Sequence, residues 1–283
     1  MTYRNLLDIL TTHHDANEAK AIAFALLEDA FGLTRTDVLL GKTEMLNEEE
    51  QHQLKLMAER LAKGEPMQYI VGKARFGDAY FNVTPATLIP RPETLELVEW
   101  VATEEKGRTD LSILDIGTGS GCIAISLAQR LPHAKVEAWD ISTEALHVAQ
   151  GNATQLGVSV TFQEQNILQP IHTSSRFTTI VSNPPYICQK ERAEMEHHVL
   201  DHEPHLALFV PDDDPLLFYR AIAQRGQELL TNGGCIYVEI NRAYGAETCE
   251  LFKTMGYTNI TLRQDEFGND RMVRACLWKN EEH

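Results

Sequence analysis

A glycine-rich turn between a short apolar run and an amphipathic segment constrains this fold more than any other feature. The run Ile113-Leu-Asp-Ile116 leads directly into Gly117-Thr118-Gly119-Ser120-Gly121. Glycines at this place let the backbone approach a ligand closely, and they leave the N–H groups of the following helix free to bind it. The sequence therefore predicts a strand, a ligand-binding turn and a helix, the opening unit of an open α/β sheet.

Strand and helix patterns alternate from Leu111 onward. Short apolar runs predict strands at Ile113–Ile116, Val136–Trp139, Val158–Phe162, Thr179–Ser182 and Cys235–Ile240. Near the C-terminus, Asn259–Arg263 and Arg271–Trp278 flank a Gly-Asn-Asp turn, which predicts an antiparallel closing pair. Alternation of this kind indicates an α/β fold, with a doubly wound, mostly parallel sheet and helices on both of its faces.

The first 66 residues predict a small helical bundle that precedes the sheet. Asp15 and Glu18 are spaced as a capping box, and the apolar stripe behind them predicts a helix that ends near Gly32. Thr36 is expected to cap a short second helix, and Asn47 a longer one. The stripes predict helix–helix packing, and their acidic faces would repel anionic lipid.

A β-hairpin linker is expected at residues 67–92, between this bundle and a domain at 93–283. Met67–Val71 and Tyr80–Val83 carry β-type residues at short spacing, and glycines and a proline separate them. Glu93 then begins a helix. The chain thus divides into a bundle, a linker and a larger α/β domain.

The five cysteines are odd in number and widely spread, and no CxxC pair occurs. This pattern predicts free thiols in a reducing, cytoplasmic setting, without a disulfide framework or a zinc site. No metal is expected, because the sequence has no HExxH or similar ligand spacing. No stretch approaches the ~18 apolar residues of a membrane span. The first residues lack the apolar region of a secretory signal.

Net charge argues against nucleic acid as a direct partner. The formal net charge is −16, and no two Lys or Arg residues are adjacent. Binding to a phosphate backbone requires clustered positive charge.

Asp140 lies nineteen residues past Gly121, at the end of the next predicted strand. A carboxylate there can accept both hydroxyls of an adenosine ribose. The glycine pattern is G-x-G-x-G, with Cys122 where a dinucleotide fingerprint has its third glycine, and this form suits S-adenosyl-L-methionine. The alternative is a tight turn without a ligand, which the position of Asp140 disfavours.

A second motif, Asn183-Pro184-Pro185-Tyr186, follows the strand predicted at Thr179–Ser182. Methyl transfer to a planar amide or aromatic amine requires lone-pair density on the nitrogen. The side-chain oxygen of Asn183 and the carbonyl of Pro184 could grip its two N–H hydrogens, and the ring of Tyr186 could pack against the planar group. The alternative is an ordinary turn, because Asn-Pro is a turn dipeptide.

These motifs resemble class I S-adenosylmethionine-dependent methyltransferases of the amino-methylating kind, and more narrowly the PrmC/HemK family of peptide chain release factor glutamine methyltransferases. The resemblance covers nearly the whole chain. It also rests on Gly64-Glu-Pro-Met-Gln-Tyr-Ile-Val-Gly72, Phe81-Asn-Val83, Leu88-Ile-Pro-Arg-Pro-Glu-Thr94, Glu203-Pro204 with Ala207-Leu208, and Asp213–Tyr219. It implies a seven-stranded, mostly parallel sheet and methylation of the glutamine in the Gly-Gly-Gln motif of release factors.

By this resemblance, cofactor-binding residues are Gly117, Thr118, Gly119, Ser120, Gly121, Asp140, Asn166 and Asn183. The glutamine would be clamped by Asn183, Pro184, Pro185 and Tyr186, of which Asn183, Pro184 and Tyr186 would be catalytic. The N-terminal bundle would help to dock the release factor. No contact with nucleic acid or a membrane is implied.

Three positions depart from the family pattern. Leu95 stands where a glutamate is usual, and Asn166-Ile167 stands where an acidic residue and an aromatic often flank the adenine. The Asn166 amide could still accept from the adenine amine, whereas Ile167 would give apolar contact only. Arg91 and Glu93 fit either an ion pair at a helix start or a place in the site.

Two rival functions remain open. An adenine or guanine methyltransferase acting on nucleic acid would share both motifs, but the chain lacks a basic groove and a separate target-reading domain. A non-catalytic binding module would have no need of both the clamp and Asp140.

Overall fold

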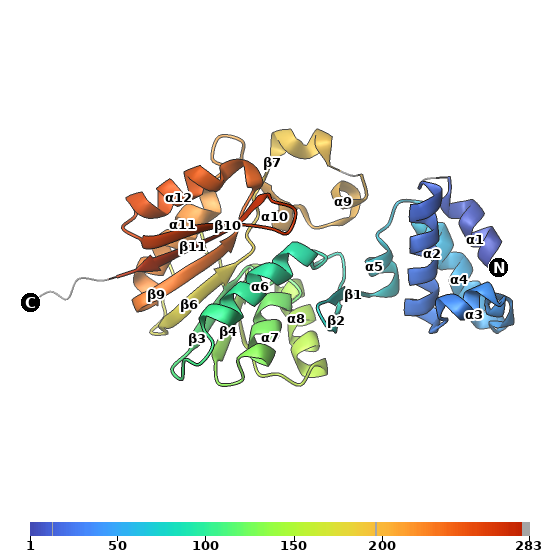
Figure 1. Ribbon diagram of the computed structural model, residues 1–283, viewed down its shortest axis with the longest axis horizontal. Coiled ribbons are helices and arrows are strands. Elements are labelled where there is room, and N and C mark those ends of the chain that lie inside the picture. The colour runs from blue at the N-terminus through green and yellow to red at the C-terminus, as the bar shows by residue number, and fades with distance from the viewer. Residues whose placement is uncertain (13, 196, 279–283) are drawn as a thin grey trace, which may run out of the picture. The chain divides into compact units, whose positions relative to one another are not determined.

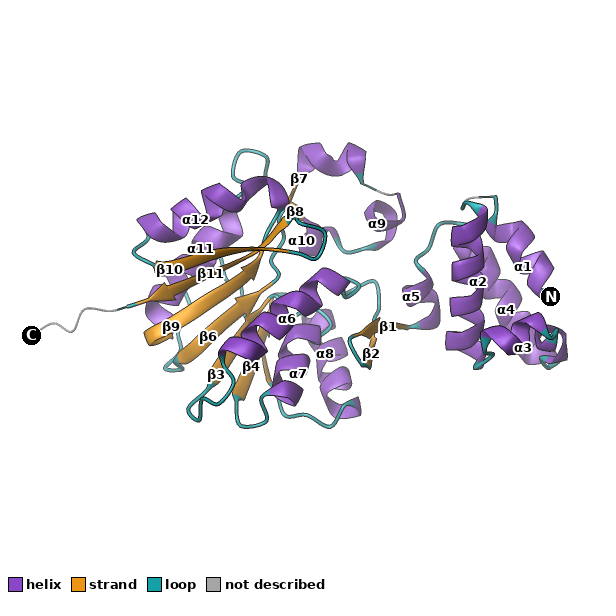
Figure 2. Ribbon diagram, in the orientation of Figure 1, coloured by secondary structure: helices purple, strands orange, loops and turns teal. Residues whose placement is uncertain are grey.

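The computed structural model describes residues 1–12, 14–195 and 197–278, which form two compact units. The first unit contains Met1–Lys73 and Met195–His202, and the second contains Ala74–Glu194 and Glu203–His283. Figure 1 follows the chain through both units, and Figure 2 separates their helices from their strands. Each unit is described by itself.

A seven-stranded sheet is the centre of the second unit, in the order β10-β11-β9-β6-β3-β4-β5. From β9 through β6, β3 and β4 to β5 the neighbours are parallel, whereas β11 is antiparallel to both β9 and β10. The strands are β3 (Ser112–Ile116), β4 (Lys135–Asp140), β5 (Thr161–Glu164), β6 (Phe177–Ser182), β9 (Leu230–Glu239), β10 (Thr258–Gln264) and β11 (Asp270–Leu277). The predicted α/β architecture is therefore confirmed.

Helices cover both faces of this sheet (Figure 2). The major ones are α6 (Pro92–Glu104), α7 (Cys122–Arg130), α8 (Thr143–Gln155), α11 (Leu217–Leu229) and α12 (Gly245–Thr254). Successive side chains of a strand point to opposite faces, so one strand serves two cores. On β3, Ile113 packs with α6 and α7, whereas Leu114 packs with α11 and α12.

The strand order reverses next to β3. From β3 the chain proceeds outward through β4 to β5, and it then returns to place β6 on the other side of β3. Loops that leave the carboxyl ends of β3 and β6 therefore diverge and leave a crevice, where open α/β sheets bind their ligands. The glycine-rich turn and the Asn-Pro-Pro-Tyr motif follow these two strands.

Short elements complete the second unit. The pair β1 (Lys73–Phe76) and β2 (Ala79–Asn82) forms a separate two-stranded sheet, and β7 (Ile187–Cys188) pairs in parallel with β8 (Phe209–Val210). The remaining short helices of this unit are η2 (Gln189–Glu194), α10 (His205–Leu208) and η3 (Arg242–Tyr244).

The first unit is helical around a core of its own. Its helices are α1 (Tyr3–Leu10), α2 (Ala16–Phe31), α3 (Arg35–Leu39), η1 (Lys42–Met45), α4 (Glu48–Leu61), α5 (Met67–Val71) and α9 (His197–His202). Leu26, Leu27 and Leu54 are among its fully buried side chains. The expected helical bundle is present.

Caps in this unit partly differ from the predicted ones. Asn47 caps α4 and α2 ends at the left-handed Gly32, as expected, and Asn47 also forms a reciprocal capping box with Glu50. Asp15 accepts from the backbone N–H groups of Asn17 and Glu18. The cap of α3 is Thr34, not Thr36, because Thr34 has the acidic partner three residues on that completes its box.

The hairpin prediction was wrong for Met67–Val71, which form the short helix α5. Pro66 precedes this helix, where a missing N–H costs nothing, and the left-handed Gly72 ends it. A helix also buries the adjacent Tyr69 and Ile70 together, which a strand would send to opposite faces. The hairpin is instead made of β1 and β2.

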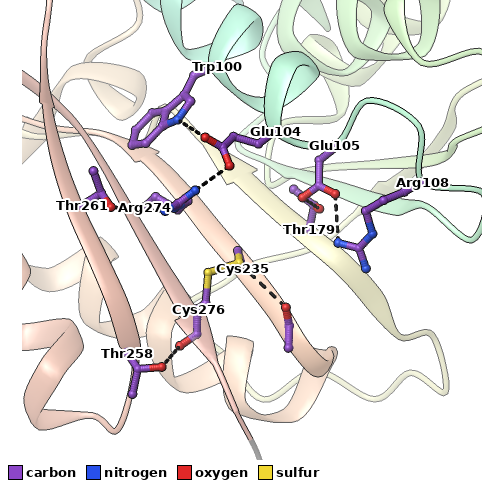
Figure 3. Close-up of a disulfide and its surroundings, with 11 residues drawn as sticks. Trp100, Glu104, Glu105, Arg108, Thr179, Cys235, Thr258, Thr261, Arg274 and Cys276 are labelled. Atoms are coloured by element: carbon purple, nitrogen blue, oxygen red, sulfur yellow. Dashed lines mark hydrogen bonds and ion pairs between the residues drawn. A yellow bond between two sulfur atoms is a disulfide. The ribbon is translucent and has the colours of Figure 1, made fainter.

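The prediction of free thiols was wrong for one pair. Cys235 of β9 and Cys276 of β11 form a disulfide, shown in Figure 3, and Cys122, Cys188 and Cys249 are free. The two residues are 41 positions apart, and the antiparallel register sets them directly opposite. This pairing depends on strand register, so cysteine spacing along the chain could not reveal it.

The described ranges contain neither a membrane-spanning helix nor a cluster of metal ligands. Among these residues, no helix is both long and apolar enough to cross a membrane. Within the same part of the chain, no group of three or more His, Cys, Asp or Glu side chains could hold a metal ion.

Candidate active site

A cavity of about 430 Å³ opens at the carboxyl ends of β3, β4 and β6, all within the second unit. A volume of this size suits a small molecule or cofactor. The predicted site residues that line it are Gly117, Thr118, Gly119, Ser120, Asp140, Asn166, Asn183, Pro184 and Pro185. Gly121 and Tyr186 are not among the lining residues, and both have other partners.

The glycines of the turn have two different roles. Gly117 and Gly119 have positive φ angles of 73° and 55°, and a Cβ on either would meet nothing within 4 Å. They therefore leave space in which a ligand can lie against the backbone. At Gly121, also at positive φ, a Cβ would lie 2.8 Å from Ile125 and 3.1 Å from Ala149. Gly121 thus allows α7 and α8 to pack closely.

Asn152 supports this turn from α8. Its side chain is fully buried, and its Nδ2 donates to the carbonyl oxygens of Ser120 and Asn82, each at 2.9 Å. Its Oδ1 accepts the backbone N–H of Asn82 at 2.7 Å. One side chain therefore ties the turn to the end of β2.

Asp140, the last residue of β4, faces the same turn. Its Oδ2 accepts the Gly119 N–H at 2.8 Å, and its Oδ1 accepts the Ser142 N–H at 2.9 Å. Burial raises the pKa of this carboxyl, and the backbone donors act in the opposite direction. Each carboxylate oxygen keeps a further lone pair that can accept a ligand hydroxyl.

Asp115, two residues before the turn, is fully buried beneath it. Its Oδ2 accepts from Thr118 Oγ1 at 2.7 Å and from the Ala124 N–H at 3.2 Å. In the described part of the chain, its Oδ1 has no hydrogen-bond partner. Burial is the main reason that the pKa of Asp115 rises to about 7.

This raised pKa predicts a pH-dependent stability for the ligand-free protein. The folded state holds the Asp115 proton more tightly than the unfolded state, where the pKa is about 3.9. Its contribution to stability is therefore greatest below about pH 4, and it is lost as pH rises to about 7. At about 1.4 kcal/mol per pKa unit, the loss is on the order of 4 kcal/mol.

Denaturant unfolding of the wild type and of Asp115→Asn at a series of pH values measures this loss. The neutral amide keeps an acceptor for Thr118 and Ala124, so the variant should lose less stability across the interval. Parallel pH curves for the two proteins would contradict the assignment.

Asn183 stands immediately after β6, where the strand places it at the cavity. Ser182 anchors this strand end, because its Oγ donates to the Ile116 carbonyl of β3 at 2.6 Å. The Nδ2 of Asn183 donates to Thr94 Oγ1 at 3.1 Å. Since Nδ2 donates to Thr94, the amide oxygen remains available to accept from a ligand in the cavity that Asn183 lines.

Glu239, the last residue of β9, connects the motif to its surroundings. It is 1 % exposed, and its two oxygens accept from Thr94 Oγ1 at 2.7 Å and from the Tyr186 hydroxyl at 3.0 Å. Burial raises the pKa of Glu239 and that of Tyr186. The Tyr186 hydroxyl thus binds a buried carboxylate.

Segments outside the sheet close the cavity. The buried Glu203 accepts the Ile89 N–H at 3.2 Å and forms an ion pair with Arg91. Arg91 also lines the cavity, so it has both of the roles considered for it, an ion pair at a helix start and a place in the site. Leu206 and Ala207, in the segment begun by Glu203, line the cavity as well.

The structure shows the contacts of the three residues that depart from the family pattern, which are Asn166, Ile167 and Leu95. Asn166 lines the cavity, but its Oδ1 accepts the Leu168 N–H at 3.0 Å, which stabilises a local turn. Ile167 belongs to the core that packs on α11, and it also reaches the cavity. Leu95 packs against the core that α6 and α7 share, and a Cβ on Gly77, in the turn between β1 and β2, would meet it.

Sequence reasoning did not single out Glu239 or Asp115 as functional residues, and it found Thr94 only within a resemblance. A usable signal was present. Glu239 is the one charged residue in the apolar run Cys235–Ile240, and Asp115 is the one in Ile113–Ile116. A carboxylate within a buried strand requires partners, and here those partners lie at the site.

Comparison with known proteins gives matches to both parts of the chain. Residues 9–72 match the PrmC N-terminal domain, and residues 95–206 match the Methyltransferase small domain. A methyltransferase from Pyrococcus furiosus has a similar structure, with a TM-score of 0.51 at 16% identity, over 70% of this chain and 89% of that one. This likeness confirms the class I S-adenosylmethionine-dependent methyltransferase fold.

Two relatives are similar to this chain over nearly its whole length. A release factor glutamine methyltransferase from Bacteroides thetaiotaomicron is 48% identical over 91% of this chain and 92% of its own. One from Flavobacterium psychrophilum is 45% identical over 94% of each chain. The resemblance inferred from the motifs is confirmed, and the chain belongs to the release factor glutamine methyltransferase family.

Proposed function

We propose that this protein transfers a methyl group from S-adenosyl-L-methionine to a glutamine side-chain amide in peptide chain release factors, within their Gly-Gly-Gln motif. The observation that carries the proposal is the placement of Asn183, which lines the same cavity as the glycine-rich turn and whose Nδ2 donates to Thr94, so that its amide oxygen is available to accept from a substrate. The relatives named release factor glutamine methyltransferases support the choice of substrate.

The residues of the cavity fit this cofactor. The open space at Gly119 suits a ligand against the backbone, and Asp140 has lone pairs for two ribose hydroxyls. Ile167 offers apolar contact to an adenine, and Asn166 is a weaker polar contact because its oxygen already serves Leu168.

The chain's own residues prepare the nitrogen for reaction. Bound S-adenosyl-L-methionine supplies an electrophilic methyl group. Asn183 Oδ1 and the carbonyl of Pro184 accept the two N–H hydrogens of the glutamine amide, which favours positive charge on its nitrogen. The two prolines hold this backbone rigid, and both line the cavity. The nitrogen loses one of its two protons to water after it has gained the methyl group, because that proton becomes acidic only then, so no base is required before transfer. Catalysis is positioning and electrostatic stabilisation.

We infer that the residues matched to the PrmC N-terminal domain help to dock the release factor, and that the protein works in the cytoplasm, where translation ends. The net charge of −16 fits a protein substrate better than a nucleic acid.

Mass spectrometry of release factors, incubated with the protein and cofactor, tests the proposal. The expected result is a mass gain of one CH₂ on the Gly-Gly-Gln glutamine, absent when cofactor is omitted. Unmodified release factor together with methylated DNA or RNA would establish the nucleic-acid alternative instead. Cofactor binding without transfer to either would indicate a binding module.

A further inference from the structure

Three side chains from distant parts of the sequence form one continuous chain of hydrogen bonds beside the cavity. Asn183 follows β6, Thr94 lies in the first turn of α6, and Glu239 ends β9. Ser182 is the register partner of Val238, so Glu239 and Asn183 leave neighbouring strands at the same level. The links are Asn183 Nδ2 to Thr94 Oγ1 and Thr94 Oγ1 to Glu239 Oε2.

The chemistry of these groups fixes the direction of the chain. An ionised carboxylate only accepts hydrogen bonds, so Thr94 must use its single proton on Glu239. Thr94 Oγ1 then has no proton left for Asn183 and can only accept a hydrogen bond from it. The donor of that hydrogen bond must be the NH₂ group of the Asn183 amide. This leaves Asn183 Oδ1 for the cavity. The orientation follows from donor counting, whichever way round the amide is drawn.

We propose that Thr94 and Glu239 are positioning residues that hold the Asn183 amide with its oxygen toward the glutamine substrate. The inference rests on the proposed function. A glutamine amide nitrogen brings two N–H donors, so a reversed Asn183 would present NH₂ to NH₂ and repel the substrate. The Asn183 amide could be turned either way with almost the same shape. Thr94 and Glu239 thus hold it in the orientation in which its oxygen is the acceptor.

The surroundings of Glu239 suit this role. Its other oxygen accepts from the Tyr186 hydroxyl, so both oxygens are engaged by the motif or its support. Burial raises the pKa of Glu239 most, the hydrogen bonds from Thr94 and Tyr186 and the positive charge of Arg271 on β11 lower it, and the negative charge of Glu93 on α6 raises it. Tyr186 therefore acts on the site through Glu239.

The kinetic test compares Thr94→Val with Thr94→Ser. Valine keeps the volume of Thr94 without its hydroxyl, and kcat for release factor methylation should fall about 10- to 100-fold, because Asn183 loses its direction and its partner. Serine restores the hydroxyl and should recover most of the rate. Cofactor affinity, measured by calorimetry, should change less than about threefold, because Thr94 acts on the substrate side.

A matched control exists within the same unit. Thr179 of β6 donates to the buried Glu105 at 2.9 Å, and neither residue is among those that line the cavity. Both residues are labelled in Figure 3. Thr179→Val removes an equivalent buried Thr–Glu hydrogen bond, so it should lower Tm about as much as Thr94→Val and leave kcat unchanged. Equal losses of kcat in the two valine variants would mean that Thr94 is merely structural, and would overturn the inference.

A double-mutant cycle tests whether Thr94 acts through Asn183. In an Asn183→Ala background, Thr94→Val should change the residual single-turnover rate by less than about twofold, because the side chain it directs is gone. A further full loss would show an independent role and would also overturn the inference. Wild-type protein that fails to methylate release factors refutes the proposed function instead.

The pH profile gives a separate readout. Protonated Glu239 can donate to Thr94, which can then donate to Asn183, so the chain reverses and kcat should fall at acid pH. The titratable and charged groups that interact with Glu239 are Glu93 on α6, Cys122 on α7, Tyr186 after β6, Tyr219 on α11 and Arg271 on β11, beside the Thr94 hydroxyl. In Glu239→Gln, kcat should be lower at every pH, and the fall of kcat at acid pH should be absent. An unchanged fall would contradict the assignment to Glu239.

Discussion

Replacing Asn183 with alanine should lower the rate of methyl transfer by about 10³-fold, the loss typical of removing one fixed polar group that stabilises a transition state. The side-chain oxygen of Asn183 is the acceptor that the amide nitrogen would need as charge develops on it. The carbonyl of Pro184 remains in the variant, so a low residual rate should persist. Single-turnover assays with release factor and saturating cofactor measure it.

Cofactor binding serves as the internal control for this variant. Asn183 is one contact among many in the cavity, so the Kd for cofactor should weaken by no more than about tenfold. A transfer rate near that of the wild type would contradict the clamp. If weaker cofactor binding alone explained the lower transfer rate, Asn183 would be assigned to cofactor binding and not to substrate binding.

Replacing Asp140 with alanine should weaken cofactor affinity by about 100-fold, because two charge-assisted hydrogen bonds to the ribose are lost together. The loss is compounded within the protein, because Asp140 also accepts the N–H groups of Gly119 and Ser142. Isothermal titration with cofactor gives the affinity directly. At saturating cofactor, kcat should recover more completely than in the Asn183 variant.

Glu164 is the control for Asp140. It ends β5, pairs with Asp140 in the sheet register and is exposed outside the cavity. Glu164→Ala removes the same charge nearby, so an equal loss of affinity would show that general electrostatics, not ribose binding, explains the Asp140 result.

Features that depend on local sequence could be predicted. The strand before Gly117, the turn itself and the place of Asp140 depend on residues close together in the chain, and the structure brings them to one cavity. The position of Asn183 also followed, because a residue at the end of a parallel strand lies at the ligand edge of the sheet.

Features that depend on the pairing of distant residues could not be predicted. The link from Asn183 through Thr94 to Glu239 requires the register of β6 against β9, which no local pattern specifies. The disulfide between Cys235 and Cys276 could not be predicted either, because it depends on the register of β9 against β11. At Met67–Val71, β-type residues favoured a strand, but burial of two adjacent side chains and the flanking Pro66 and Gly72 favoured a helix.

The buried Asn152 has a consequence for local opening of the structure. Its amide is hydrogen-bonded both to Ser120 of the glycine-rich turn and to Asn82 at the end of the hairpin, so a displacement of Asn152 breaks the hydrogen bonds of both. The turn and the hairpin end should therefore behave as one cooperative unit in native-state hydrogen exchange. Ligand bound at the turn would then slow exchange at the Asn82 amide, although that amide lies outside the cavity lining.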